Sequence, residues 1–109
     1  MIYELHTYWA APGKLDRLQA RFRSLAVPLF ARHGIQLIGI WTPAHSDAET
    51  GDLVYLLAFP DQAAQESMWQ AFADDPEWQA GEAASEVDGP LVVKATDMIL
   101  TPTDYSPLT

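Results

Sequence analysis

The sequence predicts an α+β fold of the ferredoxin-like kind, in which the element order β-α-β-β-α-β forms one four-stranded antiparallel sheet. Two observations carry this prediction: four segments rich in β-branched and aromatic residues are typical of strands, and the segments between them show a helical apolar period. The chain of 109 residues fits one domain. We expect that domain to span residues 1–101, with residues 102–109 as an extended tail.

The first strand and the first helix are the most clearly marked elements. Residues 2–9, IYELHTYW, favour a strand, and a Pro-Gly pair then breaks it. The helix that follows has an apolar face at Leu15, Leu18, Phe22, Leu25, Ala26 and Leu29. Gly34 is a typical residue after a helix end. Pro28 removes a helical hydrogen bond, which predicts a kink near Ser24.

The second half of the chain begins with two apolar segments, residues 35–41 and 53–59, which read as strands joined by a polar loop. Asp61 can cap a second helix, and Asp75 followed by Pro76 is a start signal for a short third helix. Both strands are apolar on both faces, so both faces of the sheet need cover.

Residues 91–100 supply the last strand and complete a sheet that carries helices on one face only. Something else must cover the second apolar face. The simplest cover is the same sheet of a second copy, in an isologous dimer. The sequence therefore predicts a homodimer.

Composition excludes several classes of partner. Fifteen acidic residues against six basic ones give a formal charge of −9, which repels nucleic acid and anionic membrane surfaces. The absence of cysteine excludes disulfides and thiol chemistry. The sequence shows neither a signal-peptide pattern nor a membrane-spanning apolar run. We therefore expect a cytoplasmic protein with neither nucleic acid nor membrane as a partner.

Nearly the whole chain resembles the NIPSNAP family. The resemblance rests on the order and spacing of IYELHTYWAAPGKLDRLQARFRSLAVPLFARHGIQLIGIW, VYLLAF, DDPEWQA and the closing IL-P---SPL. It implies a dimeric α+β barrel, in which two ferredoxin-like sheets close around a shared interior. The wider superfamily of that fold includes cofactor-independent monooxygenases, isomerases, polyketide cyclases and haem enzymes.

The chain departs from the family pattern at three places. His6 stands where the family usually has arginine, in YELRTY, and Gln65 stands where arginine is common before the glutamate of the second helix. Residues 56–59, Leu-Leu-Ala-Phe, replace the frequent Leu-Trp-Ala-Tyr. These exchanges indicate either that a shared family site is lost or that this member has its own ligand.

Glu4, His6 and Tyr8 form the main candidate catalytic site. Side chains alternate along a strand, so these three share one face, with neighbours about 6.5–7 Å apart. Histidine can serve as acid or base at neutral pH, a glutamate beside it would fix its tautomer, and tyrosine would hydrogen-bond a substrate oxygen. The alternative is that Glu4 and His6 bond each other, or an arginine such as Arg23, as polar groups at the barrel interior.

Four further residues are candidates for substrate binding. Trp41 and Tyr55 lie on central strands, and Trp69 on the second helix would close a pocket that they line. Arg23 is the candidate cation. Most other aromatic residues are expected in the core or the dimer interface.

The sequence therefore predicts a small-molecule enzyme without a tightly bound organic cofactor. We expect isomerase- or cyclase-like acid–base chemistry on an aromatic or polyketide-like apolar substrate. Gly-rich phosphate loops and serine elbows are absent, and the three histidines show no metal-ligand spacing, so we predict no metal. One alternative is a non-catalytic ligand-binding or interaction protein. Another is a haem-dependent or cofactor-free oxygenase, since one histidine can ligate haem.

Overall fold

The computed structural model describes residues 1–109 and contains one sheet of four strands. The strands are β1 (Ile2–Ala10), β2 (Gln36–Trp41), β3 (Leu53–Phe59) and β4 (Val92–Leu100). Their spatial order is β2-β3-β1-β4, and every pair is antiparallel. The predicted ferredoxin-like α+β fold is confirmed, with β1 as a central strand.

The first helical stretch consists of three segments that follow one another without a break: α1 (Leu15–Arg21), the π-helical turn η1 (Phe22–Ala26) and α2 (Val27–Arg32). The Val27 N–H donates to the carbonyl of Phe22, one residue further back than in an α-helix. Pro28 follows this wider turn after Val27, and the Ser24 hydroxyl donates to the Ala20 carbonyl at 2.7 Å. At Ser24, where the sequence predicts a kink, the structure has a π-turn centred on that residue.

The second helical stretch contains α3 (Gln62–Asp74) and α4 (Pro76–Ser85). Asp61 caps α3 by accepting from the Ala64 N–H at 2.8 Å, and Asp75 caps α4 by accepting from the Glu77 N–H at 2.9 Å. Both caps are as predicted. None of the helices is long and apolar enough to cross a membrane.

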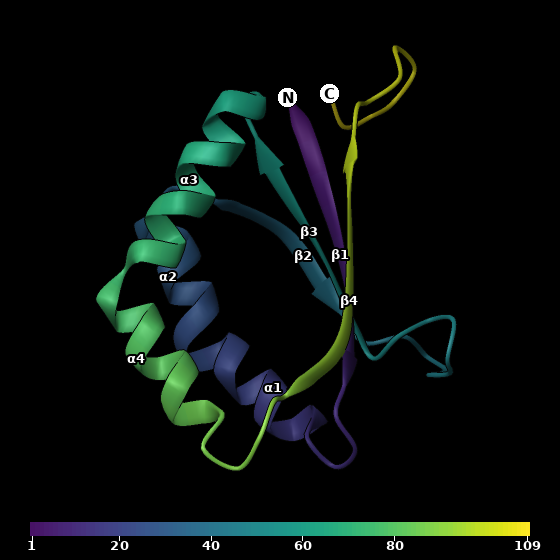
Figure 1. Ribbon diagram of the computed structural model, residues 1–109. Helices are drawn as coiled ribbons and strands as arrows, with labels where there is room; N and C mark the ends of the chain where they lie inside the picture. Colours follow the sequence, from purple (N-terminus) through teal and green to yellow (C-terminus); the bar gives the residue numbers. More distant parts are fainter.

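All helices lie on one face of the sheet, as Figure 1 shows, and the core fills the space between the two layers. The core cluster contains Leu18, Phe22, Ala26, Leu29, Phe30, Ile35, Leu53, Tyr55, Leu57, Phe59, Phe72 and Leu91. The opposite face of the sheet, here called the bare face, is covered by no helix. The C-terminal tail reaches it at one end, where the Tyr3 hydroxyl donates to the Thr109 carbonyl at 3.3 Å.

The β2 strand contains an irregularity that changes which face its residues occupy. Leu37 pairs with Leu57, but the register then shifts, so that Gly39 pairs with Leu56. Leu37 and Ile40 therefore both pack on the core, and Trp41 points to the bare face with 53% of its surface exposed. Its ring lies across Gly39, where an added Cβ would come within 2.6 Å of the indole.

Candidate functional site

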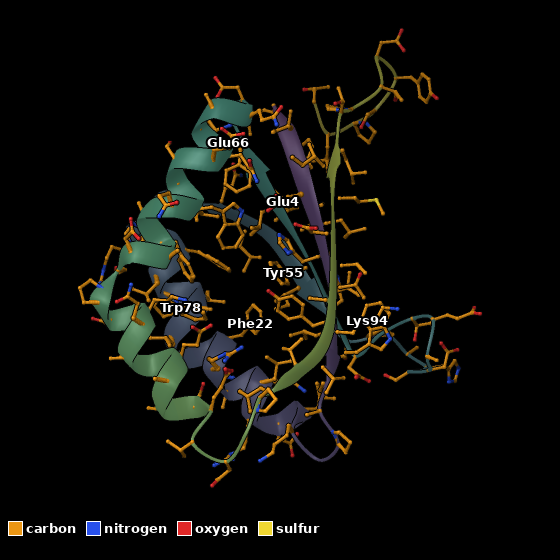
Figure 2. All side chains as sticks on the ribbon, viewed as in Figure 1. Glu4, Phe22, Tyr55, Glu66, Trp78 and Lys94 are labelled. Atoms are coloured by element: carbon orange, nitrogen blue, oxygen red, sulfur yellow. The ribbon has the colours of Figure 1, made fainter.

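The candidate site begins with the helix-facing side chains of β1. Glu4, His6 and Tyr8 share this face because they alternate with Tyr3, Leu5, Thr7 and Trp9. Glu4 is 3% exposed and His6 is 8% exposed. Figure 2 shows Glu4 between β1 and α3. The predicted row of a carboxylate, an imidazole and a phenol is therefore present on the face that the helices cover, and not on the bare face.

Glu4 is held by three donors. Its Oε1 accepts from His6 Nε2 at 2.7 Å and from Trp69 Nε1 at 2.6 Å, while its Oε2 accepts from Gln65 Nε2 at 2.6 Å. Burial raises the pKa of Glu4, but the three donors together lower it by more, so that the pKa lies below its usual 4.5. Glu4 is therefore a carboxylate at neutral pH and acts as a fixed acceptor.

The tautomer of His6 follows from this carboxylate. A carboxylate only accepts hydrogen bonds, so Nε2 of His6 must carry the proton that Glu4 receives. Nδ1 has no partner within the chain, and no fully buried side-chain nitrogen or oxygen lacks a partner. Nδ1 of the neutral ring is thus an unused lone pair in contact with solvent.

Tyr8 and Tyr55 form a second hydrogen-bonded pair, with their hydroxyl oxygens 2.8 Å apart. Tyr55 is 1% exposed, so its proton needs a protein acceptor, whereas Tyr8 is half-buried and can donate outward. The arrangement in which both hydroxyl protons have an acceptor has Tyr55 donating to Tyr8. Burial raises the pKa of both phenols above 10. Tyr8 therefore offers a neutral O–H donor to the space beside it.

That space is a cavity of about 310 Å³ between the helical layer and the sheet. Figure 2 shows Phe22, Tyr55 and Trp78 around it, with Lys94 on the other side of the sheet. Ten of its fourteen lining residues are hydrophobic, which suits a small apolar ligand. Its lining comprises Tyr8, Arg21, Phe22, Ala26, Phe30, Tyr55, Trp69, Phe72, Trp78, Glu82, Glu86, Pro90, Val92 and Ala95.

The helical end of the cavity carries charged groups. Arg21 Nη1 donates to Ser85 Oγ at 3.2 Å and lies 3.5 Å from Glu86 Oε2. The guanidinium also lies over the ring of Trp78, with its carbon 5.5 Å from the ring centroid. Glu82 lines the cavity on the same helix as Trp78.

The inner face of β4 forms the open side of the site. Ala95 pairs with Tyr8 and lines the cavity, and Asp97 pairs with His6 and is exposed. The negative charge of Asp97 raises the pKa of Tyr8, as a smaller contribution after burial. A ligand that extends out of the cavity along β4 would therefore meet His6 and Asp97 next.

The structure brings together some of the predicted site residues and separates others. Tyr8, Tyr55 and Trp69 line one cavity, with Glu4 and His6 directly behind its wall and not among the lining residues. Trp41 and Arg23 do not reach it, and the expectation that Trp41 lies on a central strand is wrong, because β2 is an edge strand. They line a separate hollow of about 440 Å³ at the edge of the sheet formed by β2.

Sequence reasoning missed Arg21 and Trp78 as lining residues. The apolar stripe of the first helix places Arg21 on a polar flank, and only the packing of α4 over that flank encloses it. Trp78 belongs to the other aromatic residues, most of which are expected in the core or the dimer interface. The signal that could have found the pair is an arginine next to the stripe together with an aromatic residue on a short capped helix.

Two of the three histidines use Nε2 for hydrogen bonds within the chain. Nε2 of His6 is engaged by Glu4, and Nε2 of His33 is engaged by Asp75 at 2.7 Å. His45 lies on an exposed loop and lines no cavity. No group of three or more histidine, aspartate or glutamate side chains is arranged to hold a metal ion.

Comparison with known families gives one match over almost the whole chain. The model of the family described as NIPSNAP matches residues 3–107. None of the curated proteins matches the chain.

Solved structures match the fold closely. An uncharacterized NIPSNAP domain protein from Burkholderia xenovorans is 22% identical, with 98% of this chain and 99% of that chain covered and a TM-score of 0.83. A NIPSNAP family protein with unknown function from Agrobacterium tumefaciens is 22% identical, with 100% and 94% covered and a TM-score of 0.81. A dabb family protein with a ferredoxin-like fold from Mesorhizobium loti is 16% identical, with 94% and 96% covered and a TM-score of 0.60.

Proposed function

Given that this chain belongs to the NIPSNAP family, we propose that it binds a small apolar or aromatic molecule in the inner cavity and acts on it by acid–base chemistry, without a tightly bound organic cofactor. The observation that carries the proposal is the cavity itself, which places a neutral Tyr8 hydroxyl beside aromatic walls. The reaction class is proton transfer next to a carbonyl, as in an isomerase or a cyclase.

Each polar residue has a distinct role in this reaction. Tyr8 donates a hydrogen bond to the substrate carbonyl oxygen, which stabilises the enolate that forms there. His6 removes the proton through Nδ1, and Glu4 fixes the ring by accepting from Nε2. The substrate reaches His6 along the open inner face of β4, because His6 itself does not line the cavity.

A proton-exchange experiment tests the proposal. Phenylacetone in D₂O supplies an aromatic ring and an exchangeable CH₂ group next to a carbonyl, and NMR measures deuterium incorporation. We expect the protein to accelerate exchange, and His6→Gln to remove roughly a hundredfold or more of that acceleration. His45→Gln, on an exposed loop, is the matched control and should exchange at the wild-type rate. Equal rates for His6→Gln and wild type would contradict the acid–base role.

The second candidate is a ligand-binding protein without chemistry. The observation that favours it is that Glu4 and His6 satisfy each other and stand behind the cavity wall. Broadening of the phenylacetone signals on binding, with no accelerated exchange, would support this candidate over the enzyme.

The proposed assembly is a homodimer through the bare face. Leu5, Leu56 and Met98 lie on this face, and Met98 is 55% exposed. Lys94 is the one charged side chain that β1, β3 and β4 present there, although the chain carries a net charge of −9. Self-association through this face therefore meets little charge repulsion, and a second copy offers a matching apolar sheet.

A further inference from the structure

We propose that Arg21 makes the inner cavity selective for a ligand that carries one carboxylate on a small aromatic body. The inference rests on the proposed function in one respect, namely that this cavity is the ligand site. It adds the chemical class of the ligand and a specificity-determining residue on the helical wall.

Arg21 is a largely buried cation with unused donors. Its side chain is 9% exposed, and both of its polar contacts, to Ser85 and Glu86, use Nη1 alone. A guanidinium has five N–H donors, so Nε and Nη2 remain without a partner in the chain. No fully buried polar side-chain atom lacks a partner, so these donors border open space.

Arg21 borders two open spaces, the inner cavity and a separate hollow of about 370 Å³ between the first helical stretch and α4. It lines the inner cavity together with Tyr8, whose pKa is raised by burial and lowered by the positive charge of Arg21. The free edge formed by Nε and Nη2 has the planar geometry that binds a carboxylate with two parallel hydrogen bonds. A carboxylate bound there places the rest of the ligand between the helical layer and Tyr8.

The walls define the body of the ligand. Phe72 and Trp78 pack with ring centroids 4.7 Å apart, and Phe22 lies near Tyr55 with centroids 5.2 Å apart. The volume of about 310 Å³ is roughly twice that of an apolar cavity that holds benzene. The cavity therefore suits a compound with one or two rings.

The two glutamates of α4 oppose the binding of an anionic ligand. Glu82 and Glu86 line the same cavity, so the local charge would favour an amine if all charges counted equally. They do not count equally, because the Arg21 side chain is 9% exposed and that of Glu86 is 34% exposed. Solvent screens the more exposed group more strongly, and the 3.5 Å contact leaves Arg21 weakly paired. The positive charge of Arg21 therefore dominates and favours a ligand with one negative charge. The two glutamates disfavour a ligand with two negative charges.

The test compares three probes that share a benzyl body and end in an anionic, a neutral or a cationic group: phenylacetate, 2-phenylacetamide and phenethylamine. Isothermal titration calorimetry measures their Kd for wild type, Arg21→Gln and Arg23→Gln. We expect phenylacetate to bind wild type about tenfold more tightly than the amide, and Arg21→Gln to abolish that preference. Arg23→Gln should keep it, because Arg23 borders the separate hollow at β2.

The outcomes separate this inference from the proposed function. If phenethylamine binds wild type most tightly, or if Arg21→Gln keeps the preference for phenylacetate, the inference is overturned while the cavity remains a ligand site. If none of the three compounds binds, both proposals fail. Should Arg21→Gln not fold, as thermal denaturation would reveal, Arg21→Lys retains the charge without the two-pronged donor and should lose most of the preference.

Discussion

The imidazole of His6 lies flat against the phenol ring of Tyr55, with ring centroids 4.5 Å apart and an interplanar angle of 2°. The two residues are direct partners in the pairing of β1 with β3. Glu4 holds the edge of the same imidazole through Nε2. The ring is thus fixed by stacking on its face and by a hydrogen bond in its plane.

This arrangement predicts a single neutral tautomer for His6. Nitrogen-15 NMR of the neutral ring should show the proton on Nε2, because the carboxylate of Glu4 accepts from that atom. Glu4→Gln should give a mixture of tautomers, since an amide can present either an acceptor or a donor. Glu66→Gln, on the exposed side of α3, is the control. A wild-type signal from the Nδ1-protonated form would show that the hydrogen bond has been assigned wrongly.

Glu4→Gln should also reduce stability in a pH-dependent way. The folded pKa of Glu4 lies below its usual 4.5, so its contribution is fully present above that pH and is lost as the pH falls through the folded value. Loss of a buried charged acceptor costs about 1–3 kcal/mol. Urea unfolding should therefore show the widest gap between wild type and Glu4→Gln near neutral pH. The gap should shrink below pH 4.5, and a gap that stays constant there would contradict the prediction.

The hydrogen bond between Tyr8 and Tyr55 predicts that two conservative variants lose different amounts of unfolding free energy. Tyr8→Phe leaves the buried hydroxyl of Tyr55 without an acceptor, which costs about 1–3 kcal/mol. Tyr55→Phe leaves Tyr8 with access to solvent, so it should cost about 1 kcal/mol or less. Chemical denaturation of both variants and of the double variant measures the difference. The reverse order would mean that Tyr8 donates to Tyr55.

The bare face predicts a variant that separates subunits without unfolding them. Met98→Glu places a charge on this face, and light scattering after size-exclusion chromatography should show a monomer with an unchanged circular dichroism spectrum. Val87→Glu is the matched control, since Val87 is 75% exposed in the turn after α4. A wild-type protein that is already monomeric would rule out the proposed dimer.

Local chemistry made most of the fold predictable from the sequence. The caps at Asp61 and Asp75 depend on the side chain and the backbone of the next few residues. Strand alternation alone puts Glu4, His6 and Tyr8 on one face of the sheet. These features need no information from distant parts of the chain.

The separation of Trp41 from Tyr55 could not be predicted in the same way. Strict alternation would put Leu37 and Trp41 on the same face, but the register shift after Leu37 turns Trp41 to the bare face. Burial of Arg21 likewise depends on α4, which is distant in sequence. Both results arise from packing between elements, so the pattern within each element does not reveal them.

The π-helical turn at Phe22–Ala26 also has a consequence for the evolution of the cavity. A π-turn holds one residue more than the α-helix around it, so deletion of one residue near Ser24 would restore a regular helix. The helix before that point would then rotate by about 100° relative to α2. Arg21 and Phe22 would both turn away from the cavity, although neither had been substituted. The charge and the shape of this cavity can therefore change together in a single deletion, and related chains with a different helix length need not share its ligand.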